Sequence, residues 1–271
     1  MKSVLLHVQD DDCLEARLQA ALAIVRASGG HLHCFHVMPV GLYPEGFGIS
    51  TGFILGDVLE HAEEQEAGLR QRLEEQLGSE DVAWSYEQSH VDPTQALISR
   101  GALADVIVLG RARHKQSPGF PVMTMFGDLL RASHTPLLVY PDDQDRFDPL
   151  GPALVAWNGT IEASNALRAA LPLLKLAESV HVLSVDEAKG LDFPALGASQ
   201  YLSQHGVHAE RSTSDAGGRE IDEALVASAR ELGASYMVMG AYGHSRAREY
   251  VFGGVTRNLL KHCPVPLLMS H

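Results

Sequence analysis

The amino-acid sequence predicts an α/β protein built from two tandem, open parallel-sheet domains. Short apolar runs alternate with longer amphipathic segments, this pattern occurs in both halves of the chain, and a glycine follows the same apolar run in each half. Continuous apolar runs are typical of strands that are covered on both faces. Amphipathic segments between them supply the crossovers of a parallel sheet.

The first half opens with an apolar run and an amphipathic helix. Residues 14–27 carry apolar side chains at helical spacing, and Gly29 and Gly30 follow where glycine commonly ends a helix. The mixed composition of residues 82–90 is typical of an edge strand. The predicted strands are 4–8, 31–38, 82–90, 105–109 and 137–140, and the predicted helices are 14–27, 57–77 and 93–102.

The second half follows the same plan and ends with a glycine-rich segment before its last helix. The predicted strands are 153–157, 180–185, 207–212, 236–239 and 265–269, and the predicted helices are 161–177, 195–205, 219–232 and 254–262.

An internal repeat supports the division into two domains. Residues 104–140 align without a gap on the end of the chain at a constant offset of 130, so that Gly110 meets Gly240. The earlier strands align at an offset near 149, which places an insertion in residues 39–60 of the first half. We expect domains at 1–141 and 153–271, joined by a linker at 142–152 that is rich in Pro and Asp.

Composition excludes several classes of protein. The formal net charge of −13 disfavours general nucleic-acid binding, although backbone N–H groups can still bind a nucleotide locally. Cys13, Cys34 and Cys263 are odd in number and widely spaced, which indicates no disulfide framework and fits a reducing compartment. No uninterrupted apolar run reaches membrane-spanning length and no signal-length leader is evident, so we expect a cytoplasmic protein without membrane contact.

The segment with the strongest chemical signal follows the strand that ends at Met239. Gly240 and Gly243 come first, and nine residues later Gly253 and Gly254 open a helix. Ligands bind beyond the carboxyl ends of strands in open α/β sheets, and glycines there let the backbone approach phosphate oxygens. The helix would add free N–H groups and the positive end of its dipole.

This spacing is neither a Walker A motif nor the dinucleotide GxGxxG motif. It resembles the signature of the universal stress protein family, in which Gly, two residues, Gly, nine residues and Gly precede a Ser or Thr. The resemblance covers nearly the whole chain as two copies. It implies a Rossmann-like fold in which the domains pack as a pseudo-dimer through the last strands, 137–140 and 267–269, and it leaves open a further homodimer of such chains.

The resemblance also implies a ligand, ATP or a related adenine nucleotide, with or without Mg²⁺ and with no structural metal. Two positions depart from the family pattern: Gly254 replaces a Ser or Thr, and Asn158 replaces the usual Asp. The implied phosphate site comprises Gly240, Gly243, Gly253, Gly254, Val255 and Thr256, and the implied adenine and ribose site comprises Ala156, Trp157, Asn158 and Val185. Met239 is a further implied nucleotide-binding residue.

The loop of the first half is a degenerate copy. Arg113 stands where the second half has Gly243, and Met123 and Thr124 stand where it has Gly253 and Gly254. These changes remove the glycines that close phosphate approach requires. An alternative that stays open is anion binding through the basic side chains Arg111, Arg113, His114 and Lys115.

The resemblance implies a non-catalytic stress-response module that senses a nucleotide or binds a partner. Two alternatives stay open: an enzyme with slow ATP hydrolysis or adenylyl transfer, and an interaction protein that binds no nucleotide. No catalytic acid–base pair emerges from the sequence.

Two polar clusters have structural explanations. Asp10, Asp11 and Asp12 precede a helix, where acids cap and stabilise the N-terminus. Along the strand 31–38, histidines alternate between faces, so at most two could share a metal; His7 could join His36 if those strands are neighbours.

Overall fold

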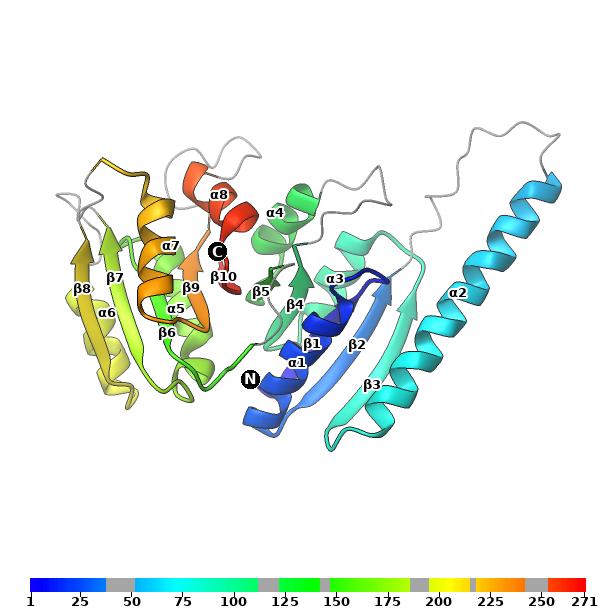
Figure 1. Cartoon of the computed structure of the whole chain (residues 1–271), viewed down its shortest axis with the longest axis horizontal. Helices are drawn as coiled ribbons and strands as arrows, with labels where there is room; N and C mark the ends of the chain where they lie inside the picture. Colours follow the sequence, from blue (N-terminus) through cyan, green and yellow to red (C-terminus); the bar gives the residue numbers. More distant parts are fainter. Residues whose placement is uncertain (38–51, 112–121, 142–146, 186–194, 215–217, 242–252) are drawn as a thin grey trace.

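The computed structural model describes residues 1–37, 52–111, 122–141, 147–185, 195–214, 218–241 and 253–271 (Figure 1). The strands are β1 (Ser3–Val8), β2 (His31–Val37), β3 (Ala83–Ser89), β4 (Val106–Gly110), β5 (Leu137–Tyr140), β6 (Ala153–Ala156), β7 (Val180–Val185), β8 (Ala209–Ser214), β9 (Tyr236–Gly240) and β10 (Leu267–Ser270). The helices are α1 (Leu14–Ser28), α2 (Gly52–Gly78), α3 (Pro93–Gly101), α4 (Val122–Ala132), α5 (Ile161–Leu174), α6 (Ala195–Gln204), α7 (Ile221–Glu231) and α8 (Gly254–His262).

The strands form one ten-stranded sheet in the order β3-β2-β1-β4-β5-β10-β9-β6-β7-β8. Neighbours are parallel within each half, and the halves meet where β5 and β10 pair antiparallel, with Leu138 opposite Leu268. The sequence prediction that the domains join through their last strands is therefore confirmed. The predicted edge strand is β3, which lies at one end of the sheet.

Helices cover both faces of this sheet. One buried apolar cluster includes side chains of α1, α2, α5 and α6, and a second on the opposite face includes side chains of α3, α4, α7 and α8. Each cluster draws residues from both halves of the chain, so the core does not stop at the β5–β10 junction. The arrowheads of β2, β3, β7 and β8 all point to the upper side of Figure 1, so the carboxyl edges of both halves face that way.

Local chemistry explains where several elements end. Gly29 ends α1 in a left-handed conformation with φ of 58°, and its amide donates to the last helical carbonyls, as the sequence predicts. Asp92 caps α3 by accepting from the Gln95 amide at 3.0 Å. Helix α5 ends at Leu174, earlier than predicted, just after Pro172, a residue that removes a backbone donor.

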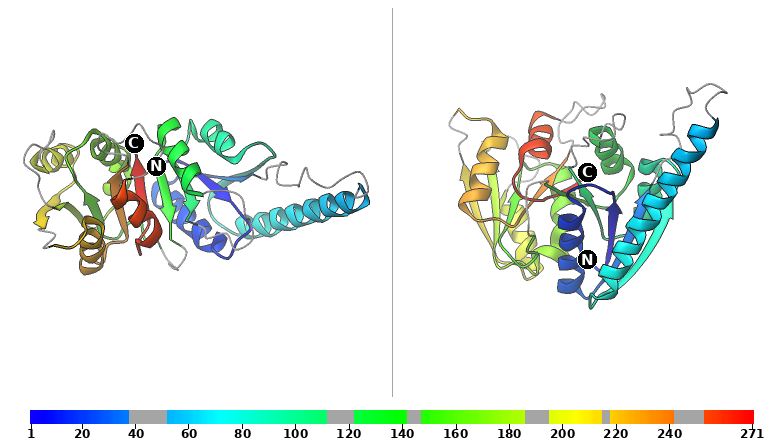
Figure 2. Two further views of the ribbon diagram at one scale, coloured as in Figure 1. Left: turned by 90° about the horizontal axis from the view of Figure 1, so that it is seen from above. Right: turned by 45° about the vertical axis from the view of Figure 1, so that its right-hand side comes forward.

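Two helices depart from the predicted elements: α4 was not predicted, although the repeat aligns it with the predicted helix 254–262, and α2 is longer than predicted. The helix begins at Gly52 and has 27 residues, whereas its counterpart α6 has 10. The predicted insertion at 39–60 thus falls partly outside the described residues and partly within α2. Figures 1 and 2 show α2 running along β3 and extending past its end.

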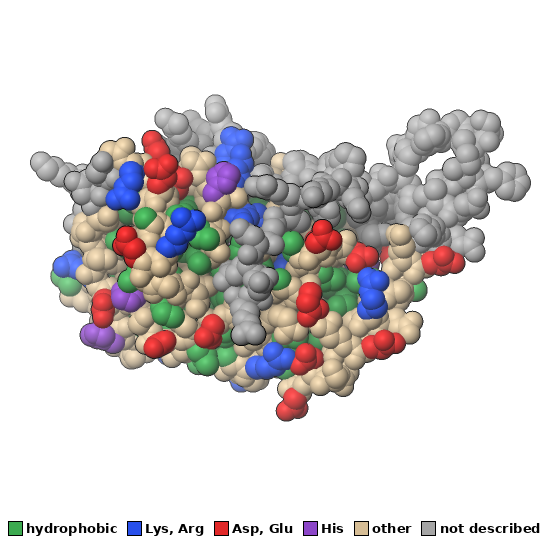
Figure 3. Space-filling view, in the orientation of Figure 1, with side chains coloured by type: hydrophobic (Ala, Val, Ile, Leu, Met, Phe, Trp, Pro, Cys, Tyr) green, Lys and Arg blue, Asp and Glu red, His purple; other side chains and the backbone are tan. Residues whose placement is uncertain are grey.

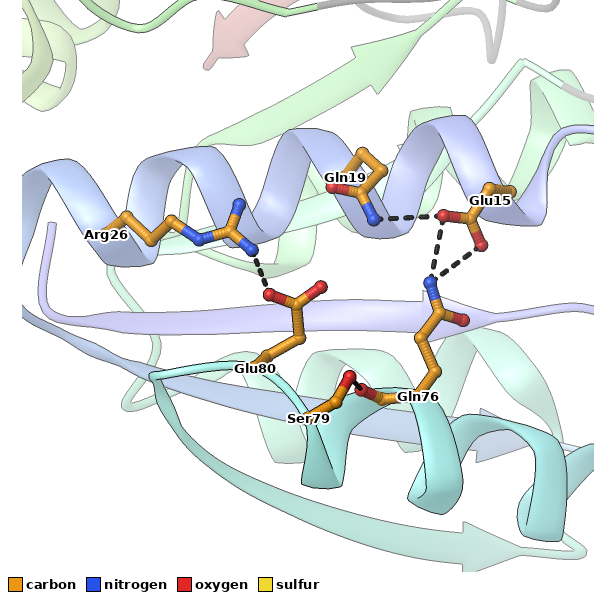
Figure 4. A network of polar contacts seen from close by, with 6 residues as sticks. All are labelled: Glu15, Gln19, Arg26, Gln76, Ser79 and Glu80. Carbon is orange, nitrogen blue, oxygen red and sulfur yellow. Dashed lines mark hydrogen bonds and ion pairs between the residues drawn. The ribbon is translucent and has the colours of Figure 1, made fainter.

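The C-terminal end of α2 is tied to α1 by polar contacts (Figure 4). The Gln76 side-chain amide donates to both carboxylate oxygens of Glu15, at 2.9 and 3.0 Å, and Arg26 pairs with Glu80 just beyond α2. Leu69, Leu73 and Leu77 are buried beneath these contacts. No helix in the described part of the chain is both long enough and apolar enough to cross a membrane.

Candidate functional site

The candidate site lies at the carboxyl edge of the C-terminal half, where three neighbouring strands end. Strand β6 lies between β9 and β7, and Ala156 is in register with Met239 on one side and with Leu183 on the other. The chain leaves β6 toward β7 and β8 and later returns to the other side of β6 as β9. This reversal makes the β6–β9 boundary the switch point at which open α/β sheets bind ligands.

The turn after β6 places Asn158 at this switch point. The Trp157 amide donates to the Leu183 carbonyl at 2.8 Å, which continues the ladder, and Gly159 reverses the chain with φ of 69°. Thr160 caps α5 by accepting from the Ala163 amide at 3.2 Å, and its hydroxyl donates to Asn158 Oδ1 at 3.0 Å. Asn158 is exposed, and its amide NH₂ group remains able to donate to a ligand.

Gly240 has a structural reason to be glycine. A Cβ at this position would lie 2.5 Å from the Ala163 nitrogen and 2.5 Å from the Glu162 carbonyl carbon, because the first turn of α5 packs on the end of β9. Real Cβ atoms do not approach backbone so closely. The glycine is therefore needed for packing, whether or not a ligand is bound.

At the N-terminus of α8, unlike at Gly240, packing does not require glycine. Gly253 and Gly254 are exposed, and a Cβ at either position would meet no atom within 4 Å. Gly253 is the N-cap with φ of −57° and supplies no side-chain cap, and the first helical bond runs from the Arg257 amide to the Gly253 carbonyl. The amides that precede Arg257 in the first turn of α8 point out of the helix end.

Two residues of the first turn lie deeper. Val255 is half-buried, and Thr256 is only 7% exposed, so its hydroxyl is less accessible than the backbone of the two glycines. Val185, at the end of β7, is half-buried as well. Gly243 lies outside the described residues.

Sequence reasoning missed the contacts that anchor the chain just after β9. The Ala241 amide donates to the Ser270 carbonyl at 2.9 Å, and the Ala241 carbonyl lies 3.0 Å from His271 Nδ1. The Asn165 side chain in turn donates to the His271 carbonyl at 3.2 Å. No spacing or composition signal marks His271 or Asn165, whereas Thr160 could have been found as a hydroxyl residue that precedes an amphipathic helix.

The N-terminal half fills the equivalent edge with a buried cation. Arg17 is fully buried, and its guanidinium donates to Asp11 at 2.8 and 3.0 Å and to the Gln9 carbonyl at 3.2 Å. A Cβ on Gly110 would lie 2.5 Å from Arg17 Nη1, so the guanidinium lies directly against the end of β4. At an offset of 149 the counterpart of Arg17 is Ala166, which cannot fill this space.

The acidic and basic residues that the sequence analysis singled out in the N-terminal half lie in different places. Asp11 accepts from the Cys13 amide at 2.9 Å, but Cys13 is itself the N-cap of α1 and the helix has no side-chain cap hydrogen bond, so the predicted capping role of this carboxylate is wrong. Asp11 instead pairs with the buried Arg17. Arg111 donates to the Cys263 carbonyl of the other half at 2.8 Å. Arg113, His114 and Lys115 lie outside the described residues.

The histidines of β2 divide between the faces of the sheet, as predicted. His31 Nε2 and His33 Nδ1 both lie near Ser85 Oγ, at 3.1 and 2.9 Å, and His36 Nδ1 lies 3.0 Å from the Tyr86 hydroxyl on the other face. The idea that His7 joins His36 is wrong, because His7 is in register with Phe35 and so faces the opposite side. No group of three or more metal-ligating side chains occurs in the part of the chain that the structure describes.

Charges on the described surface are mixed. Figure 3 shows acidic side chains scattered over one face of the molecule with basic side chains between them. Local backbone geometry, and not a dense basic surface, would therefore have to provide the attraction for a phosphate group on this face.

Comparison with known proteins agrees with this architecture. The model of the universal stress protein family matches residues 1–141 and 151–271. A universal stress protein from Archaeoglobus fulgidus is 15% identical over 98% of this chain and 97% of its own, with a TM-score of 0.66. A putative universal stress protein from Pseudomonas aeruginosa is 17% identical over 100% of this chain and 93% of its own, with a TM-score of 0.60.

A more distant structure shares the fold at full length. The cytoplasmic domain of a prokaryotic cation chloride cotransporter is 10% identical over 99% of this chain and 94% of its own, with a TM-score of 0.52. At such identity the likeness concerns the fold alone. The search of curated proteins found no matching relative.

Proposed function

The chain belongs to the universal stress protein family, and we propose that its C-terminal half binds ATP or a related adenine nucleotide between β6 and β9. The observation that carries the proposal is the open space around Gly253 and Gly254 at the start of α8. Packing does not require glycine at either position, whereas a phosphate group that approaches the backbone amides does.

The phosphates would bind to backbone groups at the start of α8. An α-helix leaves the amides of its first turn without intrahelical acceptors, and the helix dipole adds positive potential there. Gly254, Val255 and Thr256 supply these amides, and Gly253 leaves room beside them. Such a local site is compatible with the net charge of −13, since the attraction acts at contact distance.

The base and ribose would lie over the ends of β6 and β7. Ala156 and Val185 are half-buried apolar residues at these ends, and Trp157 is 5% exposed beside them. The exposed amide of Asn158 can donate to a ribose hydroxyl. Mg²⁺, if it accompanies the nucleotide, would bind chiefly through the phosphate oxygens.

We infer a sensing role and not a catalytic one. Asn158 and Thr160, the polar side chains of the turn after β6, are neutral hydrogen-bonding groups that do not transfer protons near neutral pH. Nucleotide binding in this module would instead change which conformation or partner is favoured.

Isothermal titration with ATP tests this site directly. In a Gly254→Asp variant the new carboxylate favours the helix N-terminus but repels phosphate, so the protein should fold while its ATP affinity falls by about tenfold or more. Gly68→Asp is the matched control, because Gly68 also has open space around it and lies in α2, away from the site.

Wild-type affinity in the control together with weak binding in Gly254→Asp would support the proposal. Equal affinity in all three proteins would place the nucleotide elsewhere. Absence of binding in the wild type would favour the alternative of an interaction protein without a nucleotide.

A further inference from the structure

An arginine of the N-terminal half contacts the helix that carries the proposed phosphate site. Arg111 follows β4 directly, and its backbone amide donates to the Tyr140 carbonyl at 3.0 Å. Its side chain reaches across the junction, where Nη1 donates to the Cys263 carbonyl at 2.8 Å. Cys263 is the C-cap residue of α8, so the guanidinium lies at the negative end of the helix dipole.

This contact breaks the symmetry between the halves. At the offset of 130 the counterpart of Arg111 is Ala241, and the backbone bond from Ala241 to Ser270 matches that from Arg111 to Tyr140. The framework is thus repeated, but the alanine has no side chain that could cross the junction. Only the N-terminal half contributes an arginine at this position, and it contributes it to the half that we propose binds nucleotide.

Helix α8 joins the two ends of this arrangement. It has nine residues, and its buried side chains Leu259 and Leu260 pack in the apolar cluster that also contains Phe126 and Leu129 of α4. Its N-terminus carries Gly253 and Gly254, and its C-terminus receives Arg111. A short, packed helix moves as a unit, so a contact that holds one end also limits the positions of the other.

We propose that Arg111 is a positioning residue through which the N-terminal half holds α8 in the orientation that binds phosphate. The inference rests on the proposed nucleotide function and gives the N-terminal half a part in it. The bound nucleotide and Arg111 stabilise the same placement of α8 from opposite ends. Their effects are coupled, so removing Arg111 weakens nucleotide binding although the side chain does not touch the ligand.

The test compares Arg111→Ala with Arg26→Ala, which removes a partly exposed arginine of the N-terminal half that pairs with Glu80 away from the junction. Two quantities are measured on the full chain: ATP affinity by titration calorimetry, and amide hydrogen exchange of the segment 254–262 without nucleotide. Arg111→Ala should bind ATP about fivefold more weakly, and the amides of its α8 should exchange about tenfold faster. Arg26→Ala should match the wild type, and Arg111→Lys, which keeps a cation and a donor, should fall between.

Each other outcome has a defined meaning. Exchange of α8 that is equal in Arg111→Ala and Arg26→Ala overturns the inference, and so does faster exchange with unchanged ATP affinity. A wild-type protein that binds no ATP overturns the proposed nucleotide function itself, and the exchange data then report only whether Arg111 holds α8.

Discussion

Packing requires glycine at one position of the candidate site and not at another, and substitutions can test this difference. Gly240 is required because the backbone of α5 lies where its Cβ would be. Gly254 has open space around it, so packing does not require its lack of a side chain. A spacing motif alone cannot separate these reasons, because the same letter appears at both positions.

The first prediction compares alanine at the two positions. Gly240→Ala should lower the free energy of unfolding by about 1–3 kcal/mol, since α5 must shift to admit the methyl group. Gly254→Ala should change the free energy of unfolding by less than about 0.5 kcal/mol. Urea denaturation checks both values, and a Gly240→Ala variant as stable as Gly254→Ala would contradict the packing argument.

A second prediction concerns the buried ion pair of the N-terminal half. Asp11→Asn leaves the fully buried guanidinium of Arg17 without its carboxylate, which should cost about 3 kcal/mol of stability. Asp12→Asn is the matched control, because it removes the same charge from an exposed residue. Equal unfolding midpoints for the two variants would show that the pair does not stabilise the fold.

At the element scale, strand β2 makes stability depend on pH. Burial lowers the pKa of His36 below its ordinary value of 6.5; Asp10 opposes this shift and His90 adds to it. The unfolded chain therefore takes up a proton near pH 6.5 while the folded chain does not. The contribution of His36 to stability is complete above that pH and is lost as the pH falls below it.

The third prediction follows from this direction. The free energy of unfolding should fall between about pH 7.5 and pH 5.5, and the fall should be smaller in His36→Gln than in the wild type. Urea midpoints across this range check the slope. His134→Gln, a change at an exposed histidine, should keep the wild-type slope, and an identical slope in His36→Gln would contradict the assignment.

Elements also show what the sequence could predict. Strands β4 and β5 match β9 and β10 at the offset of 130 found in the sequence, because both halves repeat buried apolar runs in these strands and Gly110 meets Gly240. The start of α2 was predicted five residues late, since Gly and aromatic residues there resemble a loop. The contacts of Arg17 and Arg111 were not predicted. The Asp11 partner of Arg17 lies six residues away in the loop before α1, and the Cys263 partner of Arg111 lies 152 residues away, so neither contact leaves a periodic signal.

On the scale of the whole molecule, the two halves share one sheet and two apolar clusters. Leu138 and Leu268 lie opposite each other at the junction and are buried, and each cluster draws residues from both halves. Exposure of one half would therefore expose core surface of the other. We expect the halves to unfold together.

The two tryptophans allow the fourth prediction to be checked, since Trp84 lies in β3 and Trp157 follows β6. Trp84→Phe and Trp157→Phe variants each leave one tryptophan to report on one half. Circular dichroism of each variant measures its loss of helix in urea and so includes any stability change caused by the substitution. In each variant, the fluorescence transition should coincide with this loss of helix. Two separated transitions would show that the junction does not couple the halves.

The central claim is that only one of the two halves binds an adenine nucleotide, and its most direct test is the stoichiometry of binding. Equilibrium dialysis of the intact chain against saturating labelled ATP measures nucleotide bound per chain. The account predicts about one nucleotide per chain, because Arg17 fills the edge of the first half while the start of α8 is open in the second. Two nucleotides per chain, or none, would contradict it.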